Sequence, residues 1–220
     1  MCSIPSDSSL QKRELSKEEI FDILAQASAM GIREVVLTGG EPLLRGDLFD
    51  ICAESRRMGL RSIVTTNGTL MDAATAEKLI SCGIGHLHFS LDGLQGSHDA
   101  MRGPGSFERT IEAIKTVNAE RKKKGGGPSL GIACVIMSSN IEDLFPLLRC
   151  ADAINVDVVT FLPLLKNNAC TPERQESAFW PRPDQMDILD SEIEKIKNFK
   201  TKHTLVYEEP GLRLFSKYYR

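Results

Sequence analysis

The sequence predicts an α/β fold built on a parallel β-sheet, and two observations favour it. Short apolar or β-branched runs alternate along the chain with amphipathic segments of about 10–15 residues, a pattern typical of βαβ units. Several amphipathic segments begin at a helix-capping residue and end at a glycine, as helices commonly do. This pattern leaves two arrangements open, an open doubly wound sheet and a barrel-like arc.

The predicted elements follow one another in a regular order. Ser16 and Glu19 match a capping box at the start of a helix that ends at Gly31. Five runs are predicted to be strands: residues 35–37, 63–65, 87–91, 132–136 and 156–161. Further helices are predicted over residues 47–58 and 72–82, capped by Asp47 and Asp72, from residue 106, over residues 141–153 and from residue 183. The polar, proline-containing residues 166–183 are predicted to form a long loop.

The composition excludes several classes of protein. With 220 residues, 41% of them hydrophobic and 26% charged, the chain can bury the core of one domain. A formal net charge of −3 gives no basic footprint for nucleic acid, and no apolar segment approaches the ~20 residues that span a bilayer. We therefore expect a cytoplasmic protein with no nucleic-acid partner and no membrane contact. The six cysteines are scattered, which argues against a disulfide framework, and Cys52 and Cys134 lie in runs expected to be buried.

Three successive predicted strands end in polar, glycine-containing segments. These segments are Thr38-Gly39-Gly40-Glu41-Pro42, Thr65-Thr66-Asn67-Gly68 and Ser90-Leu91-Asp92-Gly93, and Arg102 lies in the predicted loop after the third. Each segment alone is compatible with an ordinary turn. Their repetition favours a ligand site, because ligands bind at the carboxyl ends of the strands in parallel α/β sheets and barrels.

In this order, the three segments resemble the motifs of the radical S-adenosylmethionine (radical SAM) superfamily over roughly residues 1–200. The resemblance is strongest to the branch that often carries a C-terminal SPASM-type iron–sulfur domain and that modifies peptides or matures sulfatases. It implies a partial (β/α)6 TIM-like barrel lacking its first strand, and thereby favours the arc over the open sheet. We accordingly expect a barrel domain over residues 1–200, truncated at its N-terminus, and an extension over residues 201–220 that leads into a missing downstream domain.

The resemblance also implies the cofactors and their binding residues. The cofactors are S-adenosylmethionine and a [4Fe–4S] cluster, which together yield a 5′-deoxyadenosyl radical. The resemblance implies that six residues bind the cofactor. Gly40 and Glu41 would bind the methionine amino group, and Ser90 and Arg102 the ribose and carboxylate region. Leu162 would lie near the adenine, and Asn67 in the cofactor and substrate cleft. The residue types suit these roles, since an ammonium group needs an acceptor and a carboxylate needs a guanidinium or backbone donors.

The cluster motif of the superfamily, Cys-x3-Cys-x2-Cys, is not present in full. Cys2 lies at the distance from Gly39 that suits the third cysteine, so we expect Cys2 to be a metal ligand and the two others to be missing, although a stray cysteine remains an alternative. On this basis the chain is expected to be an inactive fragment of an enzyme. Its expected partners are a peptide or small-molecule substrate and an electron donor such as ferredoxin or flavodoxin.

Two other functions remain open at this point. The chain could be a non-catalytic barrel relative that binds a nucleotide-like ligand or a protein partner. It could also be an unrelated barrel enzyme of the aldolase or isomerase type, which would need a lysine or a metal-binding set at the strand ends. His86 and His88 share one face of a predicted strand, but a structural role on the surface or lining the barrel is expected for both.

Overall fold

The computed structural model describes residues 14–165, 178–206, 209–212 and 214–220. Within these residues, six strands form one sheet whose spatial order is the order of the chain, and every neighbouring pair is parallel. The strands are β1 (Glu34–Leu37), β2 (Arg61–Thr66), β3 (His86–Ser90), β4 (Ser129–Ile136), β5 (Val158–Pro163) and β6 (Leu205–Val206). A doubly wound sheet reverses its strand order part-way, whereas a barrel does not, so this order confirms the predicted barrel-like arc.

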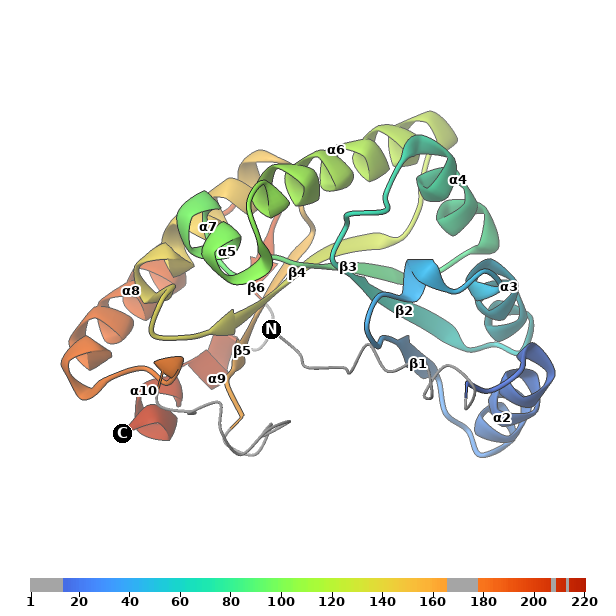
Figure 1. Ribbon diagram of the computed structural model, residues 1–220, viewed down its shortest axis with the longest axis horizontal. Coiled ribbons are helices and arrows are strands. Elements are labelled where there is room, and N and C mark those ends of the chain that lie inside the picture. Colours follow the sequence, from blue (N-terminus) through green and yellow to red (C-terminus); the bar gives the residue numbers. More distant parts are fainter. Residues whose placement is uncertain (1–13, 166–177, 207–208, 213) are drawn as a thin grey trace.

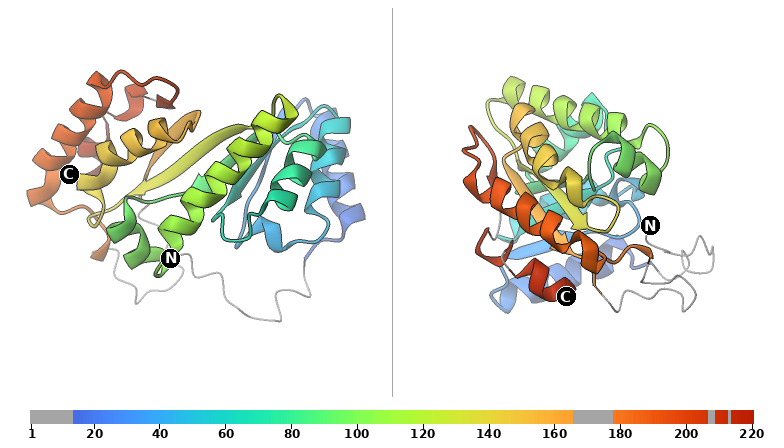
Figure 2. Two further views of the ribbon diagram at one scale, coloured as in Figure 1. Left: turned by 90° about the horizontal axis from the view of Figure 1, so that it is seen from above. Right: turned by 90° about the vertical axis from the view of Figure 1, so that its left-hand side faces the viewer.

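The helices between the strands lie along the convex side of this arc (Figure 1), and Figure 2 shows them from above as one layer. The longer helices are α2 (Lys17–Ala29), α3 (Leu48–Arg57), α4 (Ala73–Cys82), α5 (Gln95–Arg102), α6 (Ser106–Lys124), α7 (Leu144–Ala153) and α8 (Met186–Asn198). Shorter turns are η1 (Pro42–Leu44), η2 (Ile141–Asp143), η4 (Pro183–Gln185), α9 (Glu209–Leu212) and α10 (Phe215–Tyr219). Among the described residues, no helix combines the length and apolar character needed to cross a membrane.

The two faces of the sheet differ in burial. Alternate side chains point toward the helices and form the core, among them Val64, Leu87, Phe89, Ile132 and Val159, each with no exposed surface. The intervening side chains point to the concave face and are half-buried, for example Ile63, Thr65, His88, Ala133 and Thr160. The core therefore lies between the sheet and the helices, and the concave face stays accessible.

Most helix boundaries follow the predicted capping residues. Ser16 and Glu19 form the predicted capping box, with the Ser16 hydroxyl accepting from the Glu19 N–H at 3.1 Å. The Asp72 carboxylate accepts from the Thr75 N–H at 2.7 Å and caps α4. Asp47 lies at the N-cap of α3 but its side chain makes no capping bond, because the carboxylate instead pairs with the Arg45 guanidinium at 2.6 Å.

Two elements were not expected from the sequence. Residues around Arg102, predicted to be a loop, form helix α5, which ends at Gly103. Strand β6 pairs with β5 and so brings part of residues 201–220 into the sheet. The prediction that residues 201–220 lead into a further domain stays a prediction.

Strand β6 is held by a buried carboxylate on α7. Asp152 Oδ1 accepts hydrogen bonds from the backbone N–H groups of Lys202 at 2.9 Å, His203 at 2.9 Å and Thr204 at 3.2 Å. The C-terminal helix is tied to the same region, because the Tyr219 hydroxyl donates to the Ile136 carbonyl at 3.0 Å and accepts from the Leu164 N–H at 2.8 Å. Burial raises the pKa of Tyr219 to about 12, so this hydroxyl keeps its proton at neutral pH.

Replacing Asp152 should detach β6. Asp152→Ala leaves three backbone N–H groups without an acceptor, and should lower the free energy of unfolding by about 1–3 kcal/mol. Although burial acts to raise the pKa of Asp152, the N–H groups of His203, Thr204 and Lys202 lower it overall. This contribution is therefore present above the ordinary carboxyl pKa and is lost as the pH falls through the lowered one.

Denaturant unfolding at neutral and acidic pH measures both effects. The exposed Glu142 on η2 is the control, and Glu142→Ala should change stability by less than about 0.5 kcal/mol. Equal stability of Asp152→Ala and wild type at neutral pH would contradict the proposed role of Asp152.

Candidate functional site

The predicted site residues lie at one edge of the sheet. Because all six strands are parallel, the loop after β1, the end of β2, the end of β3 and the end of β5 share the carboxyl edge. Gly39 makes the turn after β1 with φ of +152°, a conformation that favours glycine, and Thr38, Gly39 and Gly40 are exposed there. The structure therefore brings the predicted segments to the same end of the arc.

The Glu41 carboxylate ties the loop after β1 to the end of β2. Its Oε1 accepts from the Thr66 hydroxyl at 2.7 Å and from the Leu43 N–H at 3.1 Å, and its Oε2 accepts from the Asn67 N–H at 2.8 Å. With both oxygens engaged, the side chain of Glu41 shapes the turn. The exposed backbone beside it, at Gly39 and Gly40, remains open to a ligand.

Asn67 forms a rigid turn directly after β2. Its Oδ1 accepts from the Thr69 N–H at 2.8 Å and hydroxyl at 2.6 Å, and the Thr110 hydroxyl donates to its carbonyl at 3.0 Å. Gly68 follows with φ of +78°, and a Cβ there would lie 3.2 Å from Phe89. Among the described residues, the Asn67 Nδ2 group has no partner, so this amide is the part of the side chain that can meet a ligand.

Asp92 is a residue whose role the sequence analysis missed. It is 2% exposed, its Oδ2 accepts from Arg102 Nε at 2.6 Å, and its Oδ1 accepts from the Val135 N–H at 3.0 Å. The Asn140 amide also donates to the Asp92 carbonyl at 2.6 Å and to the Val135 carbonyl at 2.8 Å. Asp92 thus joins the ends of β3 and β4 and fixes Arg102. In that pose the two Nη groups of Arg102 have no partner within the described part of the chain.

A neutral histidine, His98, accepts a hydrogen bond from the backbone of Asp92. The Asp92 N–H donates to His98 Nδ1 at 3.1 Å, which places the imidazole proton on Nε2. Burial, and then the cation of Arg102, lower the pKa of His98. The next residue, Gly93, has φ of +148°, and a Cβ there would lie 2.7 Å from the Ser97 hydroxyl and 2.8 Å from the Asp143 carboxylate. The short motif around Asp92 therefore depends on both Gly93 and His98.

Ser90 and Leu162 face the concave side of the sheet. Ser90 is half-buried, and its hydroxyl makes no hydrogen bond to any residue that the structure describes. By register Ser90 lies beside Ala133, which lies beside Thr160, and Leu162 is two residues further along β5 with 40% of its surface exposed. A polar hydroxyl and an apolar side chain are thus both accessible at the edge that carries Arg102.

The cysteine predictions are tested in part. Cys2 lies outside the described residues, so its role as a ligand stays a prediction. Cys52 and Cys134 are fully buried as predicted, and burial raises the pKa of the Cys134 thiol well above its ordinary value. Within the described residues, no three His, Cys, Asp or Glu side chains gather as a metal site.

The donor set suits S-adenosylmethionine. The exposed turn after β1 offers backbone acceptors for an ammonium group, the free Nη groups of Arg102 suit a carboxylate, and the Ser90 hydroxyl suits a sugar. Leu162 adds apolar surface for a flat base.

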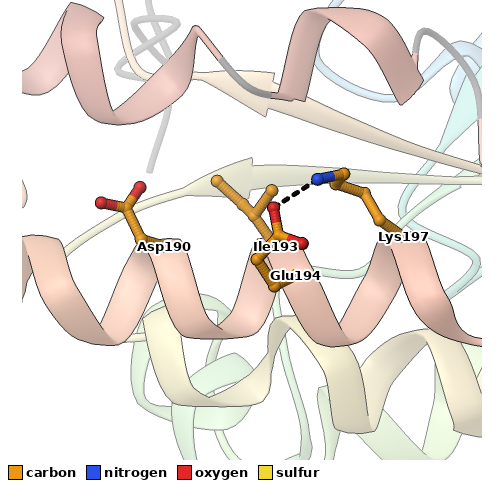
Figure 3. A pocket seen from close by; sticks show the side chains of 4 residues that line it. All are labelled: Asp190, Ile193, Glu194 and Lys197. Atoms are coloured by element: carbon orange, nitrogen blue, oxygen red, sulfur yellow. Dashed lines mark hydrogen bonds and ion pairs between the residues drawn. The ribbon is translucent and has the colours of Figure 1, made fainter.

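A surface cavity of about 370 Å³ lies elsewhere, on α8, and is lined by Asp190, Ile193, Glu194 and Lys197 (Figure 3). Its lining includes none of the strand-end residues.

Comparison with known proteins identifies the family. The sequence matches the radical SAM superfamily over residues 1–165, so the chain belongs to this superfamily, whose enzymes use S-adenosylmethionine and a [4Fe–4S] cluster. It is 33% identical over 167 residues to the AdoMet-dependent heme synthase of Methanosarcina barkeri, covering 74% of this chain and 46% of that protein.

Two further relatives have different names. The Fe-coproporphyrin III synthase of Methanosarcina barkeri is 31% identical over 134 residues, covering 60% of this chain and 32% of that protein. The PqqA peptide cyclase of Granulibacter bethesdensis is 29% identical over 155 residues, covering 70% and 40%. The chain thus spans between about a third and a half of the length of these relatives.

Solved structures share the fold. SuiB of Streptococcus suis superposes with a TM-score of 0.69 at 18% identity, covering 88% of this chain and 44% of SuiB. The anSMEcpe structure with bound AdoMet gives a TM-score of 0.66 at 17% identity, covering 86% and 55%. These likenesses support the partial barrel.

Removing the charge of Asp92 should release Arg102. In Asp92→Asn the amide can no longer accept from both Val135 and Arg102, so we expect the free energy of unfolding to fall by about 1–3 kcal/mol. Asp50→Asn is the matched control, because Asp50 also pairs with a cation, Lys17 at 3.1 Å, but on an exposed surface where such pairs contribute at most about 1 kcal/mol. Thermal and urea unfolding would measure both variants. A loss no larger in Asp92→Asn than in Asp50→Asn would show that Asp92 does not organise this edge.

Proposed function

We propose that this chain is the cofactor-binding core of a radical SAM enzyme that modifies a peptide or small-molecule substrate. The observation that carries the proposal is Arg102, held at Nε by the buried Asp92, with two Nη groups that have no partner among the described residues, at the carboxyl edge where β3 ends in the half-buried Ser90. A guanidinium fixed in this way is prepared to bind a carboxylate without further ordering.

Each predicted binding residue has a role in this proposal. The turn at Gly40 and Glu41 receives the methionine ammonium group, with Glu41 acting through the shape of the turn. Arg102 binds the carboxylate, Ser90 binds the ribose, and Leu162 packs on the adenine. Asn67 offers its free Nδ2 group to the cofactor and substrate cleft.

The iron–sulfur chemistry remains part of the proposal. Cys2 would be one ligand of the [4Fe–4S] cluster, and an electron donor such as ferredoxin or flavodoxin would reduce it in the cytoplasm. The chemistry that the cluster and S-adenosylmethionine supply when bound is reductive cleavage to a 5′-deoxyadenosyl radical, which takes a hydrogen atom from the substrate. The protein's own residues orient the cofactor along the carboxyl edge and leave the concave face of the sheet for the substrate.

The names of the relatives support two substrate classes. Two relatives are named for haem or an iron coproporphyrin, and one for a peptide. All three are named as synthases or a cyclase, so no observation favours a non-catalytic barrel relative.

Arg102→Ala should weaken S-adenosylmethionine binding by about tenfold or more, since a hydrogen bond to a charged group typically contributes about 1.5–3 kcal/mol. Isothermal titration calorimetry measures the dissociation constant. Arg149→Ala is the control, because Arg149 is exposed on α7, away from the carboxyl edge. Unchanged affinity in Arg102→Ala would rule out the carboxylate role.

In a version of the protein that carries all three cysteines of the cluster motif, Cys2→Ala should lower the iron that is retained after reconstitution with iron and sulfide under reducing conditions. The physical reason is that a cluster is held by cysteine thiolates, so one lost thiolate weakens assembly. Cys150→Ala, in the half-buried middle of α7, should retain the wild-type iron content. Iron content and the absorbance of the cluster are the measurements, and equal values for Cys2→Ala and wild type would show that Cys2 is not a ligand.

A further inference from the structure

The concave face of β3 carries two histidines below the proposed cofactor site. His86 and His88 occupy alternate positions of the strand, as does Ser90, so all three side chains share this face. The ring centroids of the two histidines are 6.1 Å apart, and their planes are inclined at 70°. His88 lies two residues before Ser90, a separation of about 7 Å along a strand.

Both imidazoles are available to a ligand. Neither ring makes a hydrogen bond to a residue that the structure describes, and both residues are half-buried. The buried side-chain atoms that lack partners are Ser62 Oγ and His98 Nε2, so the ring nitrogens of His86 and His88 are not sealed in the core. Burial, and then the neighbouring His86, lower the pKa of His88. His88 is therefore neutral at neutral pH, the form in which histidine binds metals.

The neighbouring strand leaves room for the His88 ring. His88 is in register with Gly131 of β4, and a Cβ at Gly131 would lie 2.5 Å from His88 Cδ2. On its other side His88 is in register with Thr65 of β2. The half-buried side chains around it are small or aliphatic, namely Ile63, Thr65, Ala133, Val158 and Thr160. The result is a surface of small polar and aliphatic side chains that carries the two imidazoles, with the His88 ring lying over Gly131.

The number of ligands that the protein can supply distinguishes a free metal ion from a metal held in a tetrapyrrole. A free zinc ion takes four ligands in a typical protein site, and the described residues supply no third group to join the two histidines. A metal in a tetrapyrrole already has four nitrogen ligands in its ring, and needs one imidazole from the protein. A single accessible, neutral imidazole meets that requirement.

We propose that His88, with His86 beside it, is the axial ligand for an iron tetrapyrrole that binds as substrate on the concave face of the sheet. The inference rests on the proposed function, and narrows its substrate class. The bond is a coordinate bond from the imidazole lone pair to the iron, and no redox change is required for binding. The aliphatic side chains around His88, namely Ile63, Ala133 and Val158, contact the macrocycle beneath the edge that carries Ser90.

Titration with iron(III) protoporphyrin IX tests the proposal on the 220-residue chain. Wild type should shift the Soret band to that of a histidine-ligated haem, and His88→Ala should lose the shift. Loss of an outer-shell partner alone costs about 10–100-fold in metal affinity, so loss of the ligand should weaken binding at least as much. Free imidazole added to His88→Ala should restore the spectrum, which separates a lost ligand from a misfolded protein.

Two matched controls sharpen the test. His203→Ala removes an exposed histidine just before β6, and should bind the haem as wild type does. Gly131→Ala should weaken binding by displacing the His88 ring, whereas Gly96→Ala should not, because a Cβ at Gly96 meets nothing within 4 Å. Metal-free protoporphyrin IX should bind all variants equally weakly, since it offers no iron to the imidazole.

Several outcomes would overturn the proposal. These are the absence of a Soret shift in wild type, an unchanged spectrum in His88→Ala, or loss of the spectrum in His203→Ala. The assay needs neither S-adenosylmethionine nor a cluster. Failure of haem binding with intact S-adenosylmethionine binding would therefore reject the tetrapyrrole and leave the radical SAM proposal standing. Haem binding without S-adenosylmethionine binding would instead reject the proposed cofactor site.

Discussion

All strands of this sheet run in one direction, and the architecture of the site depends on that constraint. Parallel strands in chain order put every loop that follows a strand at the same edge of the arc. The crossover helices lie on the convex side, where they bury the outward side chains, and the concave face remains accessible. A site assembled from five separate segments thus needs no special folding of any one of them. It requires only that the residues following each strand carry side chains that can bind a ligand.

Within the site, polar groups divide into those that shape loops and those that remain available. Both carboxylate oxygens of Glu41 accept hydrogen bonds, from Leu43, Thr66 and Asn67. Both carboxylate oxygens of Asp92 do so as well, from Val135 and Arg102. Among the described residues, the Ser90 hydroxyl and the outer nitrogens of Arg102 have no such partner, and Asp92 holds Arg102 in place. Preorganisation of this kind lowers the entropy cost of binding, because the protein side chains are already ordered.

Much of this could be predicted from the sequence, and the failures have physical causes. Strands β1 to β5 are recognisable as short runs that are β-branched or carry alternating apolar residues, and the order of the strand-end motifs predicts a ligand site at the carboxyl edge. Strand β6 is only two residues long and depends on Asp152, some fifty positions away, so no local sequence pattern predicts it. Helix α5 is only eight residues long, is largely polar and contains a glycine, so its sequence resembles a loop. The role of Asp92 depends on its distances to Arg102 and Val135, which only the folded chain defines.

The order of the strands also bears on how the protein folds. Since each strand pairs with its predecessor in the chain, every contact between neighbouring strands spans one helical crossover, so the sheet can be built by successive docking of βα units. The tie between Glu41 and the end of β2 can form as soon as the first two strands meet. The bond from Val135 to Asp92 must wait for β4. During synthesis from the N-terminus, this edge of the sheet would therefore be completed one loop at a time, with Arg102 fixed only after β4 has formed.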